Sequence, residues 1–303
     1  MQEFNTKVSG EYAGRRLDIF LLDFFKQNNL AFSRTFVQKL IRQGNIRLKQ
    51  RVKLKPHYKL KENDEINILF EVKREMILKA EDIPLRIIYE DDDLAVINKP
   101  QGLVVHPAPG NYEHTLVNGL LYHFKDLSDI NPKRPGIVHR LDKETSGLMV
   151  VAKNNVSHLN LISQFAKHTV KRTYIAVVKG MMEFDENIIE LPIGRHPAKR
   201  KKMSVGFSEK TKPAKTYYKT LKRAEDFSLV ELKPFTGRTH QLRVHLAFIN
   251  HPILGDDKYG NGGKSQRLML HAKTIGFIHP RTQKYIEFST EIPKEFLKIF
   301  NAK

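Results

Sequence analysis

The order of secondary structure after residue 86 constrains the fold more than any other feature of the sequence. IIYEDDDLAVINKP is typical of two strands around an acidic turn, GLMVVAK of a buried strand, and NNVSHLNLISQFAKH of a helix. KRTYIAVVKG and FSLVELKPF indicate further strands, and EIPKEFLKIF indicates a closing helix. Because these segments lack the regular alternation of a doubly wound sheet, we predict an α+β domain with a mixed, largely antiparallel sheet.

Length and composition indicate two domains and a cytoplasmic location. A chain of 303 residues suits one large domain and a small appendage. Its hydrophobic fraction of 40% is that of a globular protein, and no stretch approaches the roughly 20 apolar residues of a membrane span. The N-terminus also lacks the apolar core of a secretory signal. The sequence has no cysteine, which excludes disulfides, thiolate zinc sites and cysteine nucleophiles.

The charge balance predicts a polyanionic partner. The formal net charge is +19 at pH 7, which raises local concentrations of polyanions and gives salt-dependent affinity for phosphate backbones. A lysine-rich surface kept for solubility is the alternative. The clustering favours nucleic acid, because segment 31–61 holds ten basic residues and no acidic one. A second basic segment runs from Gly194 to Val205.

The N-terminal basic segment is typical of a small folded module. In SRTFVQKLIRQG, Ser33 is a favourable helix N-cap and Gly44 a favourable stop, with apolar residues at helical spacing between them. An earlier helix, roughly from Arg15 to Phe25, would pack against it and leave its basic face in water. NIRLK and EINILF alternate as strands do, and EVKREMILKAEDIP is typical of a charged linker.

A polar cluster in PGIVHRLDKETSGLMVVAK lies between a Pro-Gly turn and a buried strand. Such a place displays a side chain on a rigid edge. Asp142 is flanked there by Arg140 and Lys143, and a Thr-Ser-Gly run follows that can hydrogen-bond a carboxylate or shape a turn around it. Two interpretations stay open on local grounds: Asp142 carries chemistry, or it organises the turn.

A second cluster, PFTGRTHQLRVHLAFINHPILGD, is rich in arginine and histidine. His240 and His245 are five residues apart, which places them neither on one helix face nor on one side of a strand, so no metal site is expected. From a helix, Arg243 could reach a buried aspartate and keep it ionised, or form a structural salt bridge elsewhere. Tyr174, in a strand segment, would by itself be a core residue with its hydroxyl at the surface.

These segments resemble the catalytic core of the RluA-type pseudouridine synthases, and most of all the RluD- and RluC-like ribosomal large-subunit branch with an N-terminal S4 RNA-binding domain. HRLDKETSG matches that family's HRLDxxTSG motif, KRTYIAVVKG its tyrosine-bearing strand, and GRTHQLRVH its arginine motif. VINKPQGLVVHP, KPAKTYYK, HPILGDDKYG and LMLHA match further family segments in order. The resemblance implies an S4 domain at 14–72, a linker at 73–85 and a catalytic domain at 86–303.

The resemblance also implies roles for individual residues. Asp142 would be the catalytic aspartate, Arg243 the arginine that pairs with it, and Tyr174 the active-site tyrosine. Arg140 and His139 would contact substrate. We expect Arg140 to fill the gap left by a flipped base or to contact phosphate, with a plain structural role as the alternative. The basic residues expected to bind RNA are Arg34, Lys39, Arg42, Arg47 and Lys201.

The reaction implied is isomerisation of uridine in structured RNA, in which the flipped base is detached at N1 and rejoined through C5. It gains and loses no atoms or electrons, so no cofactor or metal is expected. The expected substrate is 23S rRNA, free or in an assembling large subunit, with tRNA as the closest alternative, and the expected state is a monomer. Two other classes remain: a protein that only clamps RNA, and a hydrolase that pairs Asp142 with Glu144, although those side chains would diverge.

Overall fold

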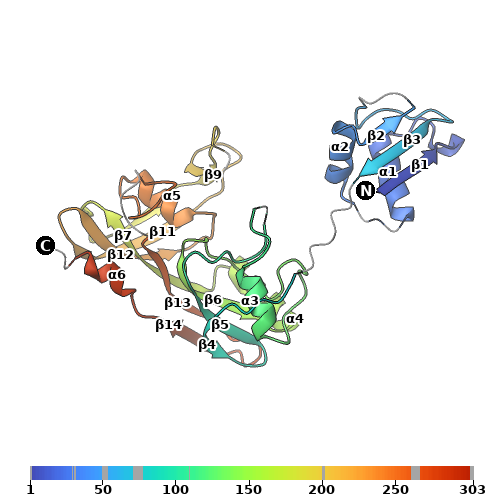
Figure 1. Ribbon diagram of the computed structural model, residues 1–303. Coiled ribbons are helices and arrows are strands. Elements are labelled where there is room, and N and C mark those ends of the chain that lie inside the picture. Colours follow the sequence, from blue (N-terminus) through green and yellow to red (C-terminus); the bar gives the residue numbers. More distant parts are fainter. Residues whose placement is uncertain are drawn as a thin grey trace. The chain divides into compact units, whose positions relative to one another are not determined.

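The computed structural model divides into two compact units, residues 1–77 and 78–303 (Figure 1). The residues that it describes are 2–28, 30, 32–49, 54–70, 78–108, 110–199, 202–260 and 267–300. Residues 78–85, assigned above to a linker, pack on the second unit. The backbone N–H of Glu81 donates to the carbonyl of Asn118 at 3.0 Å. Leu85 packs against the hydrophobic cluster that contains Leu116, Val117 and Leu120.

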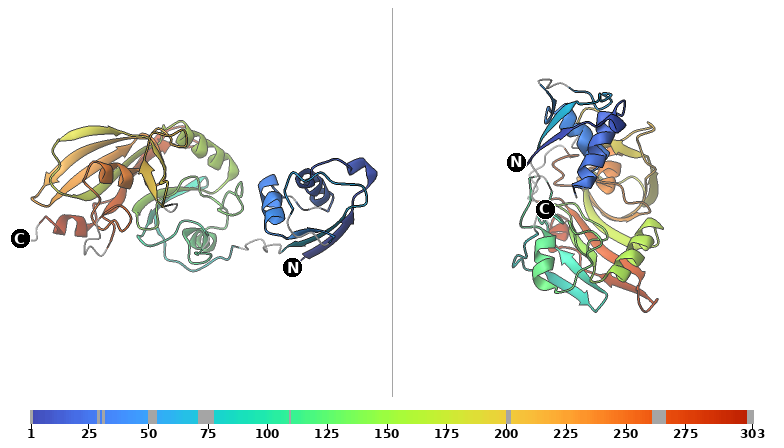
Figure 2. Two further views of the ribbon diagram at one scale, coloured as in Figure 1. Left: turned by 90° about the horizontal axis from the view of Figure 1, so that it is seen from above. Right: turned by 90° about the vertical axis from the view of Figure 1, so that its right-hand side faces the viewer.

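The first unit is a three-stranded antiparallel sheet with two helices on one face (Figure 2). In sheet order the strands are β1 (Gln2–Lys7), β3 (Glu65–Phe70) and β2 (Ile46–Leu48). The helical segments are η1 (Gly10–Tyr12), α1 (Leu17–Gln27) and α2 (Arg34–Arg42). The Ser33 hydroxyl caps α2 by accepting from the backbone N–H of Phe36 at 3.2 Å, which confirms the predicted helix start. β1 was not predicted, because QEFNTK holds a single apolar residue and shows no alternation.

The second unit is built on a nine-stranded sheet in the order β4-β5-β6-β13-β7-β12-β11-β8, with β14 paired to β13. The bounds are β4 (Arg86–Glu90), β5 (Leu94–Lys99), β6 (Ser146–Ala152), β7 (Lys171–Lys179), β8 (Glu186–Glu190), β11 (Lys215–Arg223), β12 (Phe227–Pro234), β13 (Leu270–Ile278) and β14 (Tyr285–Ser289). β6 and β13 run parallel, and the other pairs among the described residues are antiparallel. The predicted mixed, largely antiparallel α+β fold is confirmed. A separate hairpin joins β9 (Ile193–Arg195) and β10 (Met203–Val205).

Helices cover both faces of the sheet at β5 and β6 (Figure 1). α3 (Leu116–His123) packs with Ala95 and Ile97 of β5, whereas α4 (Asn155–Ala166) packs with Leu94 and Val96. Because successive strand residues point to opposite faces, the two helices lie on opposite sides, and β6 is consequently buried at every position. α5 (Gln241–Phe248) and α6 (Lys294–Lys298) share a core cluster with β7 and β12. No helix in the described ranges is long and apolar enough to cross a membrane.

The junction of β6 with β13 requires a glycine. Gly147 pairs with Ala272 and has a φ of 117°, and a Cβ added there would overlap the Ala272 backbone. An L side chain at this position would meet both conformational strain and a clash. The close approach brings the start of β6, and the loop that precedes it, to the centre of the sheet.

Candidate active site

The loop just before β6 holds Asp142 at the edge of a pocket. The backbone N–H of Thr145 donates to the Asp142 carbonyl at 3.1 Å and closes a turn. The next carbonyl, that of Lys143, accepts from the buried Lys99 ammonium at 3.1 Å and from the Gly102 N–H at 2.9 Å. Burial lowers the pKa of Lys99 to about 8, so this lysine stays charged at neutral pH and holds the loop. No role for Lys99 was predicted from the sequence.

Arg243, on the first turn of α5, joins Asp142 to a second carboxylate. Its Nε and Nη2 each lie 2.7 Å from an oxygen of Asp256, in a bidentate pair, and its Nη1 lies 3.3 Å from Oδ2 of Asp142. Burial opposes the charge on Arg243, but the hydrogen bonds and charge of Asp256 outweigh burial and raise the pKa of the guanidinium. Burial likewise opposes the charge on Asp256, and Arg243 outweighs it and lowers the pKa of that carboxyl. Arg243 is therefore a fixed cation beneath Asp142.

A pocket of about 330 Å³ opens over these residues, within the usual size of small-ligand sites. It brings together five residues singled out from the sequence, namely Asp142, Arg243, Tyr174, Arg140 and His139. The Asp142 side chain is 20% exposed and that of Arg243 3%. The carboxylate therefore faces the pocket, and the guanidinium supports it from behind.

Tyr174 and His139 line the pocket as neutral rings. Tyr174 lies in β7 and packs against two hydrophobic clusters. Burial raises the pKa of its hydroxyl, with Arg172 opposing and Asp142 adding to the shift. His139 stacks on Phe165, its Nε2 accepts from the backbone N–H of Val150 at 3.0 Å, and burial lowers its pKa to about 3. This histidine therefore shapes the wall and adds no positive charge.

The residues expected to bind RNA in the first unit differ in their surroundings. Lys39 and Arg42 on α2 and Arg47 on β2 are exposed. Arg34 forms an ion pair at 3.1 Å with Asp18, whose side chain is fully buried, so it also has a structural task. Lys201 lies outside the described residues.

Three residues of the site were missed by reasoning from the sequence. Asp256 holds Arg243 in place, His240 lies with its Nε2 3.8 Å from Oδ2 of Asp142, and the Tyr259 ring lies 5.2 Å from the Arg243 guanidinium. HPILGDDKYG, which contains Asp256 and Tyr259, was recognised as a family segment but given no chemistry. The feature of the sequence that could have pointed to Asp256 is the acidic pair Asp256 and Asp257, in a segment otherwise rich in turn-forming residues.

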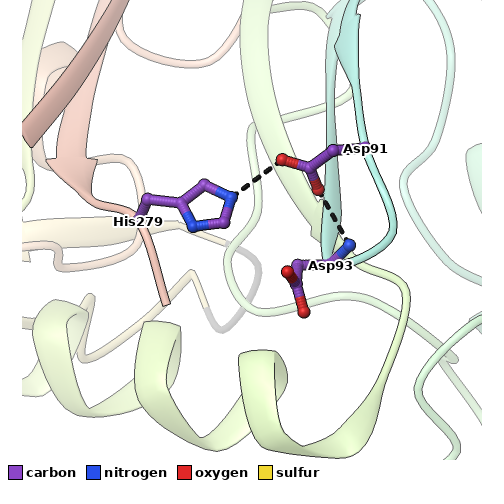
Figure 3. Close-up of side chains that lie close together, drawn as sticks. All are labelled: Asp91, Asp93 and His279. Carbon is purple, nitrogen blue, oxygen red and sulfur yellow. Dashed lines mark hydrogen bonds and ion pairs between the residues drawn. The ribbon is translucent and has the colours of Figure 1, made fainter. Parts of the chain in front are cut away.

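Outside the pocket, hydrogen bonds within the protein account for His245 and for a cluster of two aspartates and a histidine. Both ring nitrogens of His245 are engaged, by the Thr216 hydroxyl at 3.0 Å and the Leu191 carbonyl at 2.9 Å. Asp91, Asp93 and His279 lie together (Figure 3). Nδ1 of His279 accepts two backbone N–H groups, which places its proton on Nε2, and Nε2 donates to Asp91 at 2.8 Å. The imidazole has no lone pair left for a metal, and the cluster ties two hairpin turns together.

Comparison with known proteins identifies the class of enzyme. Residues 93–248 match the family described as RNA pseudouridylate synthase, and residues 15–66 match the S4 domain. The first match covers more than half of the chain, which therefore belongs to the RNA pseudouridylate synthase family and is an isomerase with an N-terminal S4 domain. The family and fold predicted from the sequence are confirmed.

Two curated relatives and one solved structure illustrate the similarity. A protein of Aquifex aeolicus named an uncharacterized RNA pseudouridine synthase is 43% identical, covering 97% of this chain and 95% of its own. The ribosomal large subunit pseudouridine synthase D of Zymomonas mobilis is 40% identical, with the same coverage of 97% and 95%. The structure of human RNA pseudouridylate synthase domain containing 1 is 26% identical with a TM-score of 0.59, covering 74% of this chain and 97% of that chain.

Proposed function

We propose that this chain isomerises specific uridines to pseudouridine in 23S rRNA, with Asp142 as the catalytic residue. One observation carries the proposal: the Asp142 carboxylate opens on the pocket while Arg243, behind it, is 3% exposed at its side chain and held by Asp256. A carboxylate fixed in this way can act as a nucleophile at C1′ or C6, or as a base at C2′. Each route uses a carboxylate held in one orientation, and the guanidinium behind Asp142 holds it.

The remaining walls suit a flipped uracil. The lining of the pocket of about 330 Å³ includes the ring of Tyr174, on which a base can stack. Since the raised pKa of Tyr174 keeps its hydroxyl protonated at neutral pH, we assign it stacking ahead of proton abstraction at C5. Arg140 is exposed at the pocket, where we propose that it fills the gap in the RNA or contacts a phosphate.

A basic groove beside the pocket suits the RNA strand that carries the uridine. This groove is a cavity of about 670 Å³ that shares Gly237, Arg238 and His240 with the pocket. Its cationic lining residues are Arg195, Lys210, Lys212, Arg238 and Lys258. Phosphates leaving the pocket would meet positive charge here. We propose that it works with the exposed basic residues of the S4 domain.

The choice of 23S rRNA rests on the relatives. Several of them, 36–40% identical over nearly their full length, are named ribosomal large subunit pseudouridine synthase D. A large folded RNA also suits a second RNA-binding domain. A cytoplasmic location and a monomeric chain stay predictions.

The test is carbodiimide mapping of pseudouridines in unmodified 23S rRNA after incubation with wild-type protein, Asp142→Asn protein or buffer. We expect new reverse-transcription stops with the wild type and none with Asp142→Asn, while filter binding shows RNA affinity within about threefold, because the change removes the reacting carboxylate and keeps its volume.

Each other outcome identifies the part of the proposal that fails. Equal reverse-transcription stops with Asp142→Asn protein and with wild type would show that the reaction does not need the Asp142 carboxylate. Stops in tRNA and none in 23S rRNA or in precursor subunits would move the substrate to tRNA. Binding to all three RNAs without stops in any would favour a protein that only clamps RNA.

A further inference from the structure

His240 is an unassigned side chain at the reacting carboxylate. It precedes α5 as its N-cap with φ 55° and ψ 21°, a left-handed conformation uncommon for a residue other than glycine. Its side chain is 13% exposed, it lines the pocket, and its Nε2 lies 3.8 Å from Oδ2 of Asp142. This separation is longer than a hydrogen bond, and catalytic hydrogen bonds commonly shorten when substrate binds.

The hydrogen bonds behind His240 determine which ring nitrogen carries its proton. The backbone N–H of Met203 donates to the Tyr259 hydroxyl oxygen at 2.9 Å, and that hydroxyl lies 2.7 Å from Nδ1 of His240. The hydroxyl oxygen already accepts one hydrogen bond, so its own proton is available for Nδ1. An Nε2 lone pair facing the Asp142 carboxylate would be repelled, whereas Nε2–H is attracted. The arrangement therefore favours a neutral imidazole protonated on Nε2.

The hydrogen bonds from Met203 through Tyr259 to His240 form a relay that ends beside one oxygen of Asp142. Among the described residues, the side-chain contacts of Asp142 with Arg243 and with His240 both go to Oδ2. With Arg243 and His240 both on the Oδ2 side, Oδ1 has no side-chain partner among the residues that the structure describes. The relay begins at β10, in the hairpin that lines the basic groove, so its hydrogen bonds connect that groove to His240, beside the carboxylate.

We propose that His240 is a positioning residue for the isomerisation: its Nε2–H, oriented by the Tyr259 hydroxyl, holds Oδ2 of Asp142 so that Oδ1 reacts. This inference rests on the proposed function, because it assigns His240 a task in that reaction. It predicts that the chemical step depends on a hydrogen-bond donor at Nε2 and on the Tyr259 hydroxyl. RNA affinity depends far less on either, because the cationic residues that line the basic groove are unchanged.

The kinetic test is single-turnover release of tritium from 23S rRNA transcribed with uridine labelled at C5, since forming the new bond expels the C5 hydrogen. We expect His240→Ala to lower the rate about 10- to 100-fold, as loss of a hydrogen bond to a charged group does, and Tyr259→Phe to lower it about 3- to 10-fold. Filter-binding affinity should stay within about twofold. His240→Gln should recover most of the rate, because its amide N–H replaces Nε2–H.

Tyr122→Phe, at an exposed position outside the pocket, is the matched control and should keep the wild-type rate. An unchanged rate in a folded His240→Ala protein would overturn the proposal. So would equal losses in His240→Gln and His240→Ala, or a fall in RNA affinity as large as the fall in rate.

A second readout separates this proposal from the proposed function. Nitrogen-15 NMR of histidine-labelled wild-type protein without RNA should show His240 protonated on Nε2 and unprotonated on Nδ1, and Tyr259→Phe should shift the Nδ1 signal. The opposite tautomer would overturn the relay whatever the activity. The expected tautomer together with a wild-type protein that releases no tritium would contradict the proposed function and, with it, a positioning role for His240 in that reaction.

Discussion

At the scale of single residues, the site depends on how a buried guanidinium is held. Arg243 has one strong partner, Asp256, with two contacts of 2.7 Å, and a longer contact of 3.3 Å to Asp142. The bidentate pair fixes the plane of the guanidinium. Arg243 can then direct Nη1 at the reacting carboxylate without neutralising it in a close ion pair.

We predict that Asp256→Asn destabilises the second unit by about 3 kcal/mol at pH 7, because it leaves the buried guanidinium without its main counter-ion. The rate of isomerisation should fall as well, since Arg243 loses its fixed plane. Urea unfolding and tritium release measure the two effects. Asp126→Asn, at an exposed position outside the pocket, is the control and should change stability by less than about 0.5 kcal/mol.

The same pair predicts a pH dependence. The pKa of Asp256 in the fold lies below its ordinary value of 3.8. Its contribution to stability is therefore complete above that value and is lost as the pH falls through the lower, folded pKa. The stability difference between wild type and Asp256→Asn should shrink as the pH falls below about 4. A difference that stays constant down to pH 2 would contradict this assignment.

At the scale of elements, one buried carboxylate joins the two helices of the S4 domain. Asp18 on α1 accepts from Gln38 of α2 at 2.8 Å, from Arg34 at 3.1 Å and from Arg16 at 3.0 Å. Burial alone would raise the pKa of Asp18, but these hydrogen bonds lower it to about 2. α2 carries exposed basic residues, so its attachment to α1 sets the geometry of an RNA-binding surface.

We predict that Asp18→Asn lowers the stability of the S4 domain by about 2 kcal/mol at pH 7, which corresponds to the shift of this pKa. In the wild type this contribution is complete above the ordinary value of 3.8 and is lost as the pH falls through about 2. Hydrogen exchange of the α1 and α2 amides in the full chain measures the change. Asp23→Asn, on the same helix with a 46% exposed side chain, should have almost no effect, and equal losses in both variants would refute the role of Asp18.

At the scale of the whole molecule, the net charge is +19, and segment 31–61 of the S4 domain, where RNA is expected to bind, holds ten basic residues and no acidic one. We predict that Lys39→Gln, Arg42→Gln and Arg47→Gln together weaken binding to 23S rRNA and reduce the slope of log affinity against log salt by about 2 to 3, because each phosphate contact contributes about 0.7 to 0.9. Filter binding across a salt series in the full-length protein measures the slope.

The matched control is a triple variant in the second unit that removes the same charge. It replaces three exposed lysines with glutamine: Lys125, Lys133 and Lys284. It should change the slope by less than about 1, because general electrostatic attraction is screened beyond roughly 10 Å. Equal slopes for the two triple variants would show that the basic residues of the S4 domain make no local contact with RNA.

Some features of this protein follow from the sequence by itself. The N-cap at Ser33, the strands on either side of the Asp91 turn and the buried β6 are encoded within about ten neighbouring residues, through capping, alternation and apolar runs. HRLDKETSG and GRTHQLRVH indicated the family and singled out Asp142 and Arg243 as candidates, because both segments match family motifs in the expected order.

Tertiary structure alone decided how those residues are held. Arg243 meets Asp142 across 101 positions of the chain and takes its firm partner, Asp256, from a loop 13 residues away. Asp256 follows no helical or strand period relative to Arg243, so no local pattern pairs them. The relay through Tyr259 to His240 depends on a loop, a hairpin and a left-handed N-cap meeting in space. The sequence therefore determined the family and the groups proposed to do the chemistry, and packing decided their partners, because the counter-ion of a buried charge is whichever group the fold brings within hydrogen-bonding distance.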